Sequence, residues 1–184
     1  MINLDKALSI VGWMKPAELT WLAEHASNAD IAVEIGSWQG RSTRALGDHI
    51  QQKVFAVDCL LTDARMRYPR KAHKARSARE QFFRNLDDLL KDGRVVLIDH
   101  NSQNGLPPDL YHLLGCVDLL FIDGDHSEGG VRSDIKYFGP LVRPGGIISG
   151  HDYSHVKHPG VKIVVDEYFP QAQFCESIWW TTAS

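Results

Sequence analysis

The residues most able to bind a ligand follow a short apolar run near position 30. Glu34 precedes two glycines, Gly36 and Gly40, which are separated by three residues. Glycine permits positive φ and a close approach of ligand to backbone, and the start of a following helix presents unpaired N–H groups. This pattern predicts a buried strand over 31–36, a tight turn, and a helix over 41–50.

The glycine spacing also says which ligand to expect. A dinucleotide loop usually reads G-x-G-x-x-G, because a pyrophosphate must lie on its backbone. Here the pattern is E-x-G-x-x-x-G, and the acid suits a ligand that carries positive charge and no phosphate. An ordinary strand-to-helix turn would give the same short pattern, so other parts of the chain must decide.

Further polar residues end the later apolar runs. Asp58 follows the run 54–57, about twenty residues after the glycine turn, where nucleotide-binding α/β folds place an acid on the ribose. Asn101 and Ser102 follow a strand predicted over 94–98 and are candidates for an adenine edge, or equally turn formers. Asp123 ends a strand over 117–122, and His151 follows one over 146–149.

The elements that must position these residues alternate along the chain. Additional helices are predicted over 2–12, 16–28, 109–115, 129–141 and 161–169, and the tail 173–182 should form a final strand or hairpin. Strands alternating with helices indicate an α/β protein with a mostly parallel sheet and helices on both faces. Gly36, Asp58, Asn101, Asp123 and His151 should then meet at the carboxyl ends of the strands. Trp13 and Trp21 are expected to be packing residues.

The bulk properties favour one soluble domain. A length of 184 residues makes a single domain the default expectation. The net charge of −3 gives no general case for nucleic-acid binding. No apolar run reaches membrane-spanning length, and the first eleven residues lack a signal-peptide core. The three widely spaced cysteines fit reduced thiols. We therefore expect a cytoplasmic protein with one domain over 1–184, made of N-terminal helices over 1–28 and a core over 30–182.

A basic segment interrupts this pattern. Seven cations follow Asp63 with no acid between them: Arg65, Arg67, Arg70, Lys71, Lys74, Arg76 and Arg79. The segment could be a solvated loop and helix start, which we favour, or a lid that attracts an anionic acceptor.

One long stretch carries a specific resemblance. The run FIDGDHSEGGVRSDIKYFGPLVRPGGIISGHDY, residues 121–153, together with the glycine pattern and Asp58, resembles a branch of the class I S-adenosylmethionine-dependent methyltransferases. That branch includes macrolide-sugar and aminocoumarin-sugar O-methyltransferases and cephalosporin-hydroxylase-like proteins. The resemblance covers roughly residues 30–182. It implies a Rossmann-like three-layer α/β/α sandwich whose seven-stranded, mostly parallel sheet ends in an antiparallel strand.

The resemblance also implies a reaction and a cofactor site. The reaction is transfer of a methyl group from S-adenosylmethionine to a small hydroxylated acceptor, with a sugar as one candidate, by a protein that could pair as a homodimer. Glu34, Gly36, Ser37 and Gly40 would line the methionine and ribose end of the cofactor. Asp58 would bind the ribose hydroxyls, Asn101 and Ser102 would lie near adenine, and Asp123 would lie below the sulfonium.

Many relatives of this kind add a divalent cation, and the matching positions here are Asp123, His151 and Asp152. Relatives most often have oxygen ligands at the second place, and Mg²⁺ favours oxygen donors. Three alternatives stay open: His151 is not a ligand, the metal is a softer one, or no metal is used.

The general base is expected two or three residues after Asp123. His126 is the preferred candidate, because a histidine with an ordinary pKa offers a neutral imidazole at physiological pH. Asp125 is the second candidate, or a group that orients His126. The alternative is helix capping by Asp125 and Ser127.

Other function classes are less consistent with these residues. A cofactor-binding module without catalysis would share the same fold. A metal-dependent hydrolase could use the cluster Asp123, His126, His151, Asp152 and His155, but it has no need for the glycine turn and Asp58. A nicotinamide oxidoreductase would need a different glycine spacing.

Overall fold

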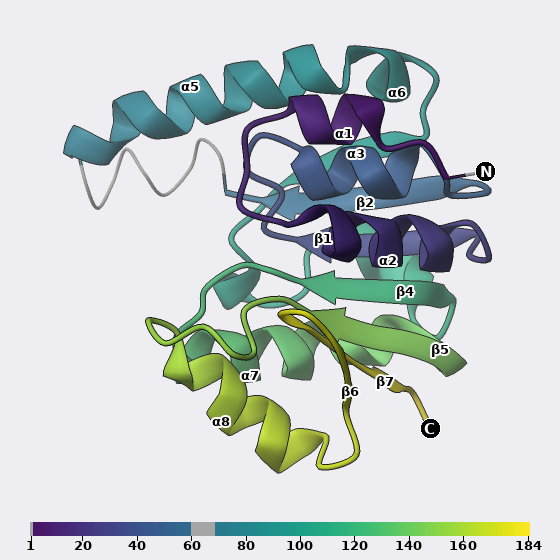
Figure 1. Cartoon of the computed structure of the whole chain (residues 1–184), viewed down its shortest axis with the longest axis vertical. Coiled ribbons are helices and arrows are strands. Elements are labelled where there is room, and N and C mark those ends of the chain that lie inside the picture. Colours follow the sequence, from purple (N-terminus) through teal and green to yellow (C-terminus); the bar gives the residue numbers. More distant parts are fainter. Residues whose placement is uncertain (1, 60–68) are drawn as a thin grey trace.

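The structure, a computed structural model, describes residues 2–59 and 69–184, except for the side chains of 69–76. Its centre is a seven-stranded sheet with the strand order β3-β2-β1-β4-β5-β7-β6 (Figure 1). The strands are β1 (Ile31–Ile35), β2 (Lys53–Asp58), β3 (Val95–Asp99), β4 (Val117–Ile122), β5 (Val142–Gly150), β6 (Gln173–Cys175) and β7 (Ile178–Thr182).

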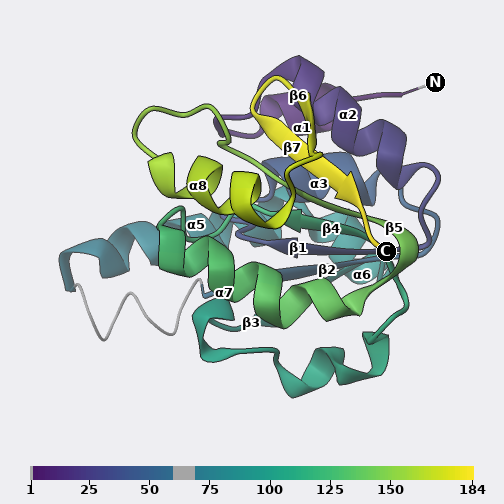
Figure 2. The same ribbon diagram turned by 90° about the horizontal axis from the view of Figure 1, so that it is seen from below.

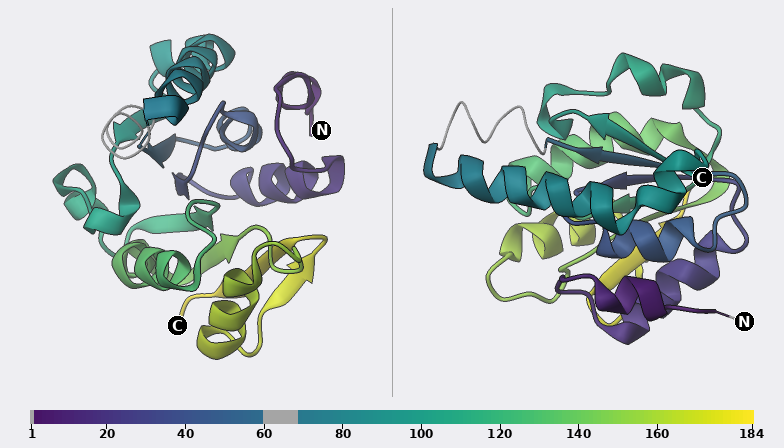
Figure 3. Two further views of the ribbon diagram at one scale, coloured as in Figure 1. Left: turned by 90° about the vertical axis from the view of Figure 1, so that its left-hand side faces the viewer. Right: turned by 90° about the horizontal axis from the view of Figure 1, so that it is seen from above.

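The first five strands pair in parallel, and β7 runs antiparallel to both β5 and β6. This arrangement confirms the predicted fold class, including the antiparallel strand that follows the parallel ones. The strand order reverses between β1 and β4, where parallel α/β sheets open a ligand crevice at the carboxyl ends. The left panel of Figure 3 looks onto this edge of the sheet.

Helices cover both faces of the sheet (Figure 2). They are α1 (Asp5–Ser9), α2 (Pro16–Ala26), α3 (Arg41–Gly47), α5 (Pro69–Asn85), α6 (Asp87–Lys91), α7 (Glu128–Phe138) and α8 (Pro159–Tyr168), with 3-10 turns η1 (Ser102–Asn104), η2 (Pro108–Leu113) and η3 (Gly139–Leu141). Helices α1, α2, α3 and α6 and the C-terminal half of α5 contribute to one apolar core, and η2, α7 and α8 to the other.

Alternate residues of each central strand enter the two cores. Leu119 and Phe121 of β4 belong to the first core, whereas Leu120 and Ile122 belong to the second. A strand that is buried on both faces needs apolar side chains on both, which explains why these strands read as continuous apolar runs. The result is the three-layer sandwich.

Several predicted boundaries were wrong. The first helix covers Asp5–Ser9 instead of 2–12, the helix after the glycine turn ends at Gly47, and β5 begins at Val142 instead of Gly146. The helix expected over 109–115 is the 3-10 turn η2. The tail forms the hairpin β6–β7. None of the described helices is long and apolar enough to cross a membrane.

Candidate functional site

Two cavities open at the carboxyl ends of the central strands, and Gly36 lines both. The larger has a volume of about 650 Å³, and its walls include Trp13, Glu18, Ser37, Trp38, Asp123, His126, His151, Asp152, His155 and His158. The smaller, about 290 Å³, is lined by Asp58, Asn101, Ser102, Gln103 and Asp125 among others. The site therefore has two chambers, one on each side of the glycine turn.

The turn itself allows only glycine at position 36. Gly36 has φ of +88°, and a Cβ built there would lie 2.1 Å from the backbone oxygen of Asp123. The carboxyl ends of β1 and β4 can approach each other this closely only because the side chain is absent. Gly40 also has positive φ. A Cβ there would meet Phe82 in α5 and Leu86, the first residue after α5, so Gly40 packs against that end of the helix.

Glu34 lies behind the turn. Its side chain is fully buried, and its Oε2 accepts a hydrogen bond of 2.5 Å from the hydroxyl of Thr43 in α3. Oε1 and the Ser37 hydroxyl are buried with no hydrogen-bond partner in the described part of the chain. Burial raises the pKa of Glu34 to about 7. Glu34 and Gly40 line neither cavity, so they support the turn from behind.

Asp58 joins the turn to the smaller cavity. Its Oδ2 accepts a hydrogen bond of 2.8 Å from the backbone N–H of Trp38, a residue with φ of +44°. Burial raises the pKa of Asp58 to about 6, against the effect of that hydrogen bond. On the opposite wall, the Asn101 side chain accepts from Gln103 N and caps η1, while Ser102 is buried. Asn101 is thus a turn former that also lines the cavity.

The larger cavity contains a cluster of acids and histidines. His126 Nε2 lies 3.1 Å from Asp123 Oδ1 and 3.0 Å from Asp152 Oδ2. His151 Nδ1 lies 3.3 Å from Asp152 Oδ1 and 3.8 Å from Asp123 Oδ1. The residues predicted as metal ligands, Asp123, His151 and Asp152, do lie together, with potential ligand atoms within 4.8 Å of one another.

The acids of this cluster change the pKa of His126, which was expected to be that of an ordinary histidine. Its interactions with Asp123 and then Asp152 raise its pKa to about 9. The imidazole is therefore charged at neutral pH in this geometry, whereas an ordinary histidine pKa was expected. Burial raises the pKa of Asp123. Burial would also raise the pKa of Asp152, but hydrogen bonds from His126 and His151 hold it below its ordinary value.

Asp125 has a local role. Its Oδ1 accepts a hydrogen bond of 2.9 Å from Ser127 N, and the Ser127 hydroxyl accepts one of 3.1 Å from Gly130 N at the start of α7. The capping interactions suggested for both residues are present. Asp125 lines the smaller cavity, whereas His126 lines the larger one.

Sequence reasoning missed Glu18. This α2 residue is 1% exposed, and its carboxylate accepts hydrogen bonds from Lys15 N (2.6 Å) and Ser177 N (3.1 Å). Oε1 also lies 3.2 Å from His151 Nε2, outside hydrogen-bond geometry. Burial opposes ionisation, but these partners lower the pKa of Glu18 to about 2. Lys15 is a local helix-cap partner, but Ser177 and His151 are far along the chain, so no sequence pattern places Glu18 at this site.

The loop after β5 adds two histidines that the sequence left unassigned. The rings of His126 and His158 stack with centroids 4.3 Å apart, and His155 stacks on His158 at 4.6 Å. His158 Nε2 lies 3.9 Å from Asp152 Oδ2. The four histidines between positions 126 and 158 were the available sequence signal.

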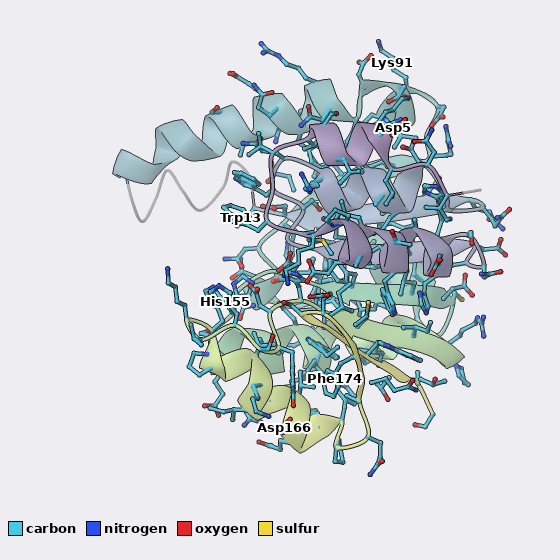
Figure 4. The ribbon with its side chains drawn as sticks, viewed as in Figure 1. Asp5, Trp13, Lys91, His155, Asp166 and Phe174 are labelled. Atoms are coloured by element: carbon cyan, nitrogen blue, oxygen red, sulfur yellow. The ribbon has the colours of Figure 1, made fainter. Side chains whose placement is uncertain are left out.

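Trp13 was expected to be a packing residue, and this was wrong. It is 79% exposed and lies beside Trp38, with ring centroids 4.4 Å apart, on the wall of the larger cavity. Figure 4 shows Trp13 and His155 on the side toward which the arrows of β4 and β5 point in Figure 1. Trp21 is buried as expected.

The basic segment falls mostly outside the described residues. Arg65 and Arg67 are not described, and neither are the side chains of Arg70, Lys71, Lys74 and Arg76. Arg79 is described, and it forms an ion pair of 2.8 Å with Asp99 at the end of β3. The choice between a solvated segment and a lid stays a prediction.

Comparison with known proteins bears on this site. A family model described as a methyltransferase domain matches residues 33–153. An O-methyltransferase from Bacillus cereus in complex with SAH is similar in structure, with a TM-score of 0.65 and 15% identity over 98% of this chain and 90% of that one. The O-methyltransferase NovP has a TM-score of 0.62 and 20% identity over 90% and 79% of the two chains.

A third match is CalS11, a TDP-rhamnose 3'-O-methyltransferase of calicheamicin biosynthesis, with a TM-score of 0.61 and 14% identity over 89% of this chain and 76% of that one. At such identities the structural matches indicate a common fold.

Proposed function

Because the chain belongs to the methyltransferase domain family, matched over residues 33–153, we propose that it transfers a methyl group from S-adenosylmethionine to a hydroxyl oxygen of a small acceptor. One observation carries the proposal: the two cavities that Gly36 lines differ in chemistry. One holds an acid suited to a ribose, and the other holds an acid and histidine cluster suited to a reacting hydroxyl.

The residues around Gly36 fit the cofactor. Gly36 lines both cavities, so a ligand that lies along the glycine turn would reach from one cavity to the other. Asp58, Asn101 and Ser102 line the chamber proposed for the adenosine part. Ser37 and Asp123 line the chamber proposed for the methionine end. The buried Ser37 hydroxyl lines the larger cavity and has no hydrogen-bond partner among the described residues, so a polar group of the cofactor, directly or through water, would satisfy it.

Methyl transfer requires the protein mainly to position the acceptor and to remove its hydroxyl proton. The sulfonium donor is already activated, so the protein must align the acceptor oxygen with the methyl group and remove the hydroxyl proton. Asp123, His151 and Asp152 are our proposed ligands for a divalent ion, because their potential ligand atoms cluster on the cavity wall. When bound, such an ion would lower the hydroxyl pKa and orient the acceptor.

His126 stays our proposed acid–base residue, with Asp125 second. His126 faces the larger cavity, whereas the Asp125 carboxylate is engaged in capping. A charged imidazole cannot accept a proton, so His126 can act as a base only after its interactions with Asp123 and Asp152 weaken. An acceptor or ion that binds between these carboxylates and His126 would have that effect.

The direct test is methyl transfer. Protein supplied with isotope-labelled S-adenosylmethionine and a panel of hydroxylated acceptors should form O-methylated product, and calorimetry should show binding of S-adenosylmethionine but not of NAD. Binding without product on every acceptor would favour the cofactor-binding module. Binding of NAD alone would overturn the proposal.

A pair of variants tests the acid–base assignment. His126→Ala should lower kcat by about 10²–10⁴-fold, the scale for loss of a general base, while affinity for S-adenosylmethionine stays near that of the unsubstituted protein. Asp125→Asn, which keeps an oxygen to accept from Ser127 N, should stay close to it in both. If the kcat of His126→Ala is unchanged, His126 is not the base.

A further inference from the structure

The proposed ion site contains a nitrogen donor that an all-oxygen site would lack. His151 Nδ1 faces Asp123 Oδ1 at 3.8 Å and Asp152 Oδ1 at 3.3 Å. Ligand atoms about 2.0–2.2 Å from one ion lie roughly 3–4 Å from one another. These two separations therefore suit a single ion with His151 as one of its ligands.

Glu18 lies beside the nitrogen of His151 that faces away from the two aspartates. The Glu18 carboxylate is held in place by two backbone N–H groups, and its Oε1 lies 3.2 Å from His151 Nε2. Nε2 therefore faces a buried anion and Nδ1 faces the aspartates. A histidine ligand usually has a carboxylate or carbonyl beside its second nitrogen, which sets its tautomer and orientation. Glu18 stands in that position, although it lies outside the matched family segment.

The other potential metal ligands near this site also include histidine nitrogens. A second group, His126, Asp152 and His158, also brings its potential ligand atoms within 4.8 Å of one another and shares Asp152 with the first. Each such group found among the described residues contains at least one histidine. Imidazole nitrogen suits Zn²⁺, Ni²⁺, Fe²⁺ and Cu²⁺, whereas Mg²⁺ and Ca²⁺ take oxygen ligands.

We propose that the Asp123–His151–Asp152 site takes a borderline transition-metal ion of the Zn²⁺ or Co²⁺ type in preference to Mg²⁺, and that Glu18 is the positioning residue that holds His151 as a nitrogen donor. This deepens the proposed function and rests on its metal-assisted form. Ion binding can nevertheless be measured without S-adenosylmethionine or an acceptor, so the two proposals can fail separately.

The first experiment is a titration of metal-free protein with Co²⁺, followed by its visible absorption, and with Mg²⁺, followed by calorimetry. Co²⁺ is expected to bind at least about tenfold more tightly than Mg²⁺ and to be displaced by Zn²⁺. Tighter binding of Mg²⁺, or no binding of Co²⁺, overturns the proposal. Binding of S-adenosylmethionine to the same preparation reports separately on the proposed function.

Variants then test the residues. His151→Asn replaces the nitrogen donor by an amide oxygen, so it should lower the affinity for Co²⁺ and raise that for Mg²⁺. An unchanged Co²⁺ spectrum in this variant removes His151 from the site. Glu18→Gln should weaken Co²⁺ binding about 10–100-fold, as for other residues that orient a metal ligand.

Glu176→Gln is the matched control for Glu18. Glu176 is also near α2, but it pairs on the surface with Lys15 Nζ at 2.8 Å, so its substitution should leave Co²⁺ binding unchanged. Equal loss in both variants, or no loss in Glu18→Gln, overturns the role of Glu18. Circular dichroism checks that Glu18→Gln is folded, and if it is not, the change of ion preference in His151→Asn decides.

Discussion

At the scale of single residues, two buried carboxylates should make the stability of the protein depend on pH. Glu34 and Asp58 lie on adjacent strands around the glycine turn, and burial raises the pKa of both. A carboxyl whose pKa is raised in the folded protein binds its proton more tightly there than in the unfolded chain. Its stabilising contribution is complete below the unfolded pKa and is lost as pH rises through the folded pKa.

Glu34→Gln should therefore change the pH dependence of stability. The pKa of Glu34 rises from 4.5 to about 7, so the unsubstituted protein loses stability between these values. The free energy of unfolding of the variant, relative to the unsubstituted protein, should increase by roughly 3 kcal/mol from about pH 4.5 to about pH 8. Urea unfolding at several pH values measures it. Glu24→Gln, at an exposed site on α2, should show no such trend.

Asp58 should affect cofactor binding. Asp58→Ala removes a partner of the proposed ribose hydroxyls, and it should weaken S-adenosylmethionine binding by about 1–3 kcal/mol. In the unsubstituted protein, affinity should fall as pH drops through about 6, because the acid becomes protonated there. Calorimetry on the acidic and the alkaline side of that value tests both points. Asp109→Ala, at an exposed site in η2, is the control, and equal losses in the two variants would remove Asp58 from the site.

At the scale of elements, the glycine turn is the part that tolerates least change. Gly36→Ala would combine positive φ with a Cβ 2.1 Å from Asp123 O, and backbone must move to relieve that contact. Gly115→Ala meets the same backbone strain, with φ of +67°, but no atom lies within 4 Å of the added Cβ. Gly115→Ala should cost about 1–2 kcal/mol.

Gly36→Ala should cost more than Gly115→Ala and should also abolish S-adenosylmethionine binding. Urea midpoints give the stabilities, and calorimetry gives the binding. Similar losses of stability in the two variants, with binding retained, would show that the close approach at Gly36 is not required.

The order of the elements could be predicted from sequence, because apolar runs and glycine turns are local signals. The residues at which the elements begin and end often could not be predicted. The predicted first helix stops at Ser9, and Arg41 Nη1 donates to the Ile10 carbonyl at 2.6 Å from a position 31 residues away. Similarly, β5 starts early because Val142 pairs with Val117 before a register shift. Such partners are tertiary contacts that periodicity does not contain.

Some residues of the candidate site could likewise be placed from the sequence, and others could not. Residues at strand ends, such as Asp58, Asp123 and His151, could be placed from the chain order alone, because the carboxyl ends of parallel strands share one edge. Glu18 and His158 could not be placed, because Glu18 lies on a helix outside the motifs and His158 lies in the loop after β5. The sequence also could not give the raised pKa of His126, which depends on the side-chain directions of two aspartates.

At the scale of the whole molecule, cofactor binding should stabilise the fold. A ligand present at about 100 times its Kd adds roughly 2.7 kcal/mol to the free energy of unfolding. For a chain of this size that raises Tm by roughly 5–10 °C. S-adenosylmethionine and its demethylated product should both produce the shift in calorimetric melting, and NAD should produce none. A shift with NAD alone would contradict the cofactor assignment.

The hydrogen bond from Ser177 N to Glu18 has a consequence for synthesis of the protein. The two residues are 159 positions apart, and Ser177 lies in the turn between β6 and β7, the last two strands in the chain. During translation the strands β1 to β5 can emerge and pair while Glu18 still lacks this partner. A nascent chain can thus have its glycine turn folded early, but its His151 environment is completed only after residue 177 has left the ribosome.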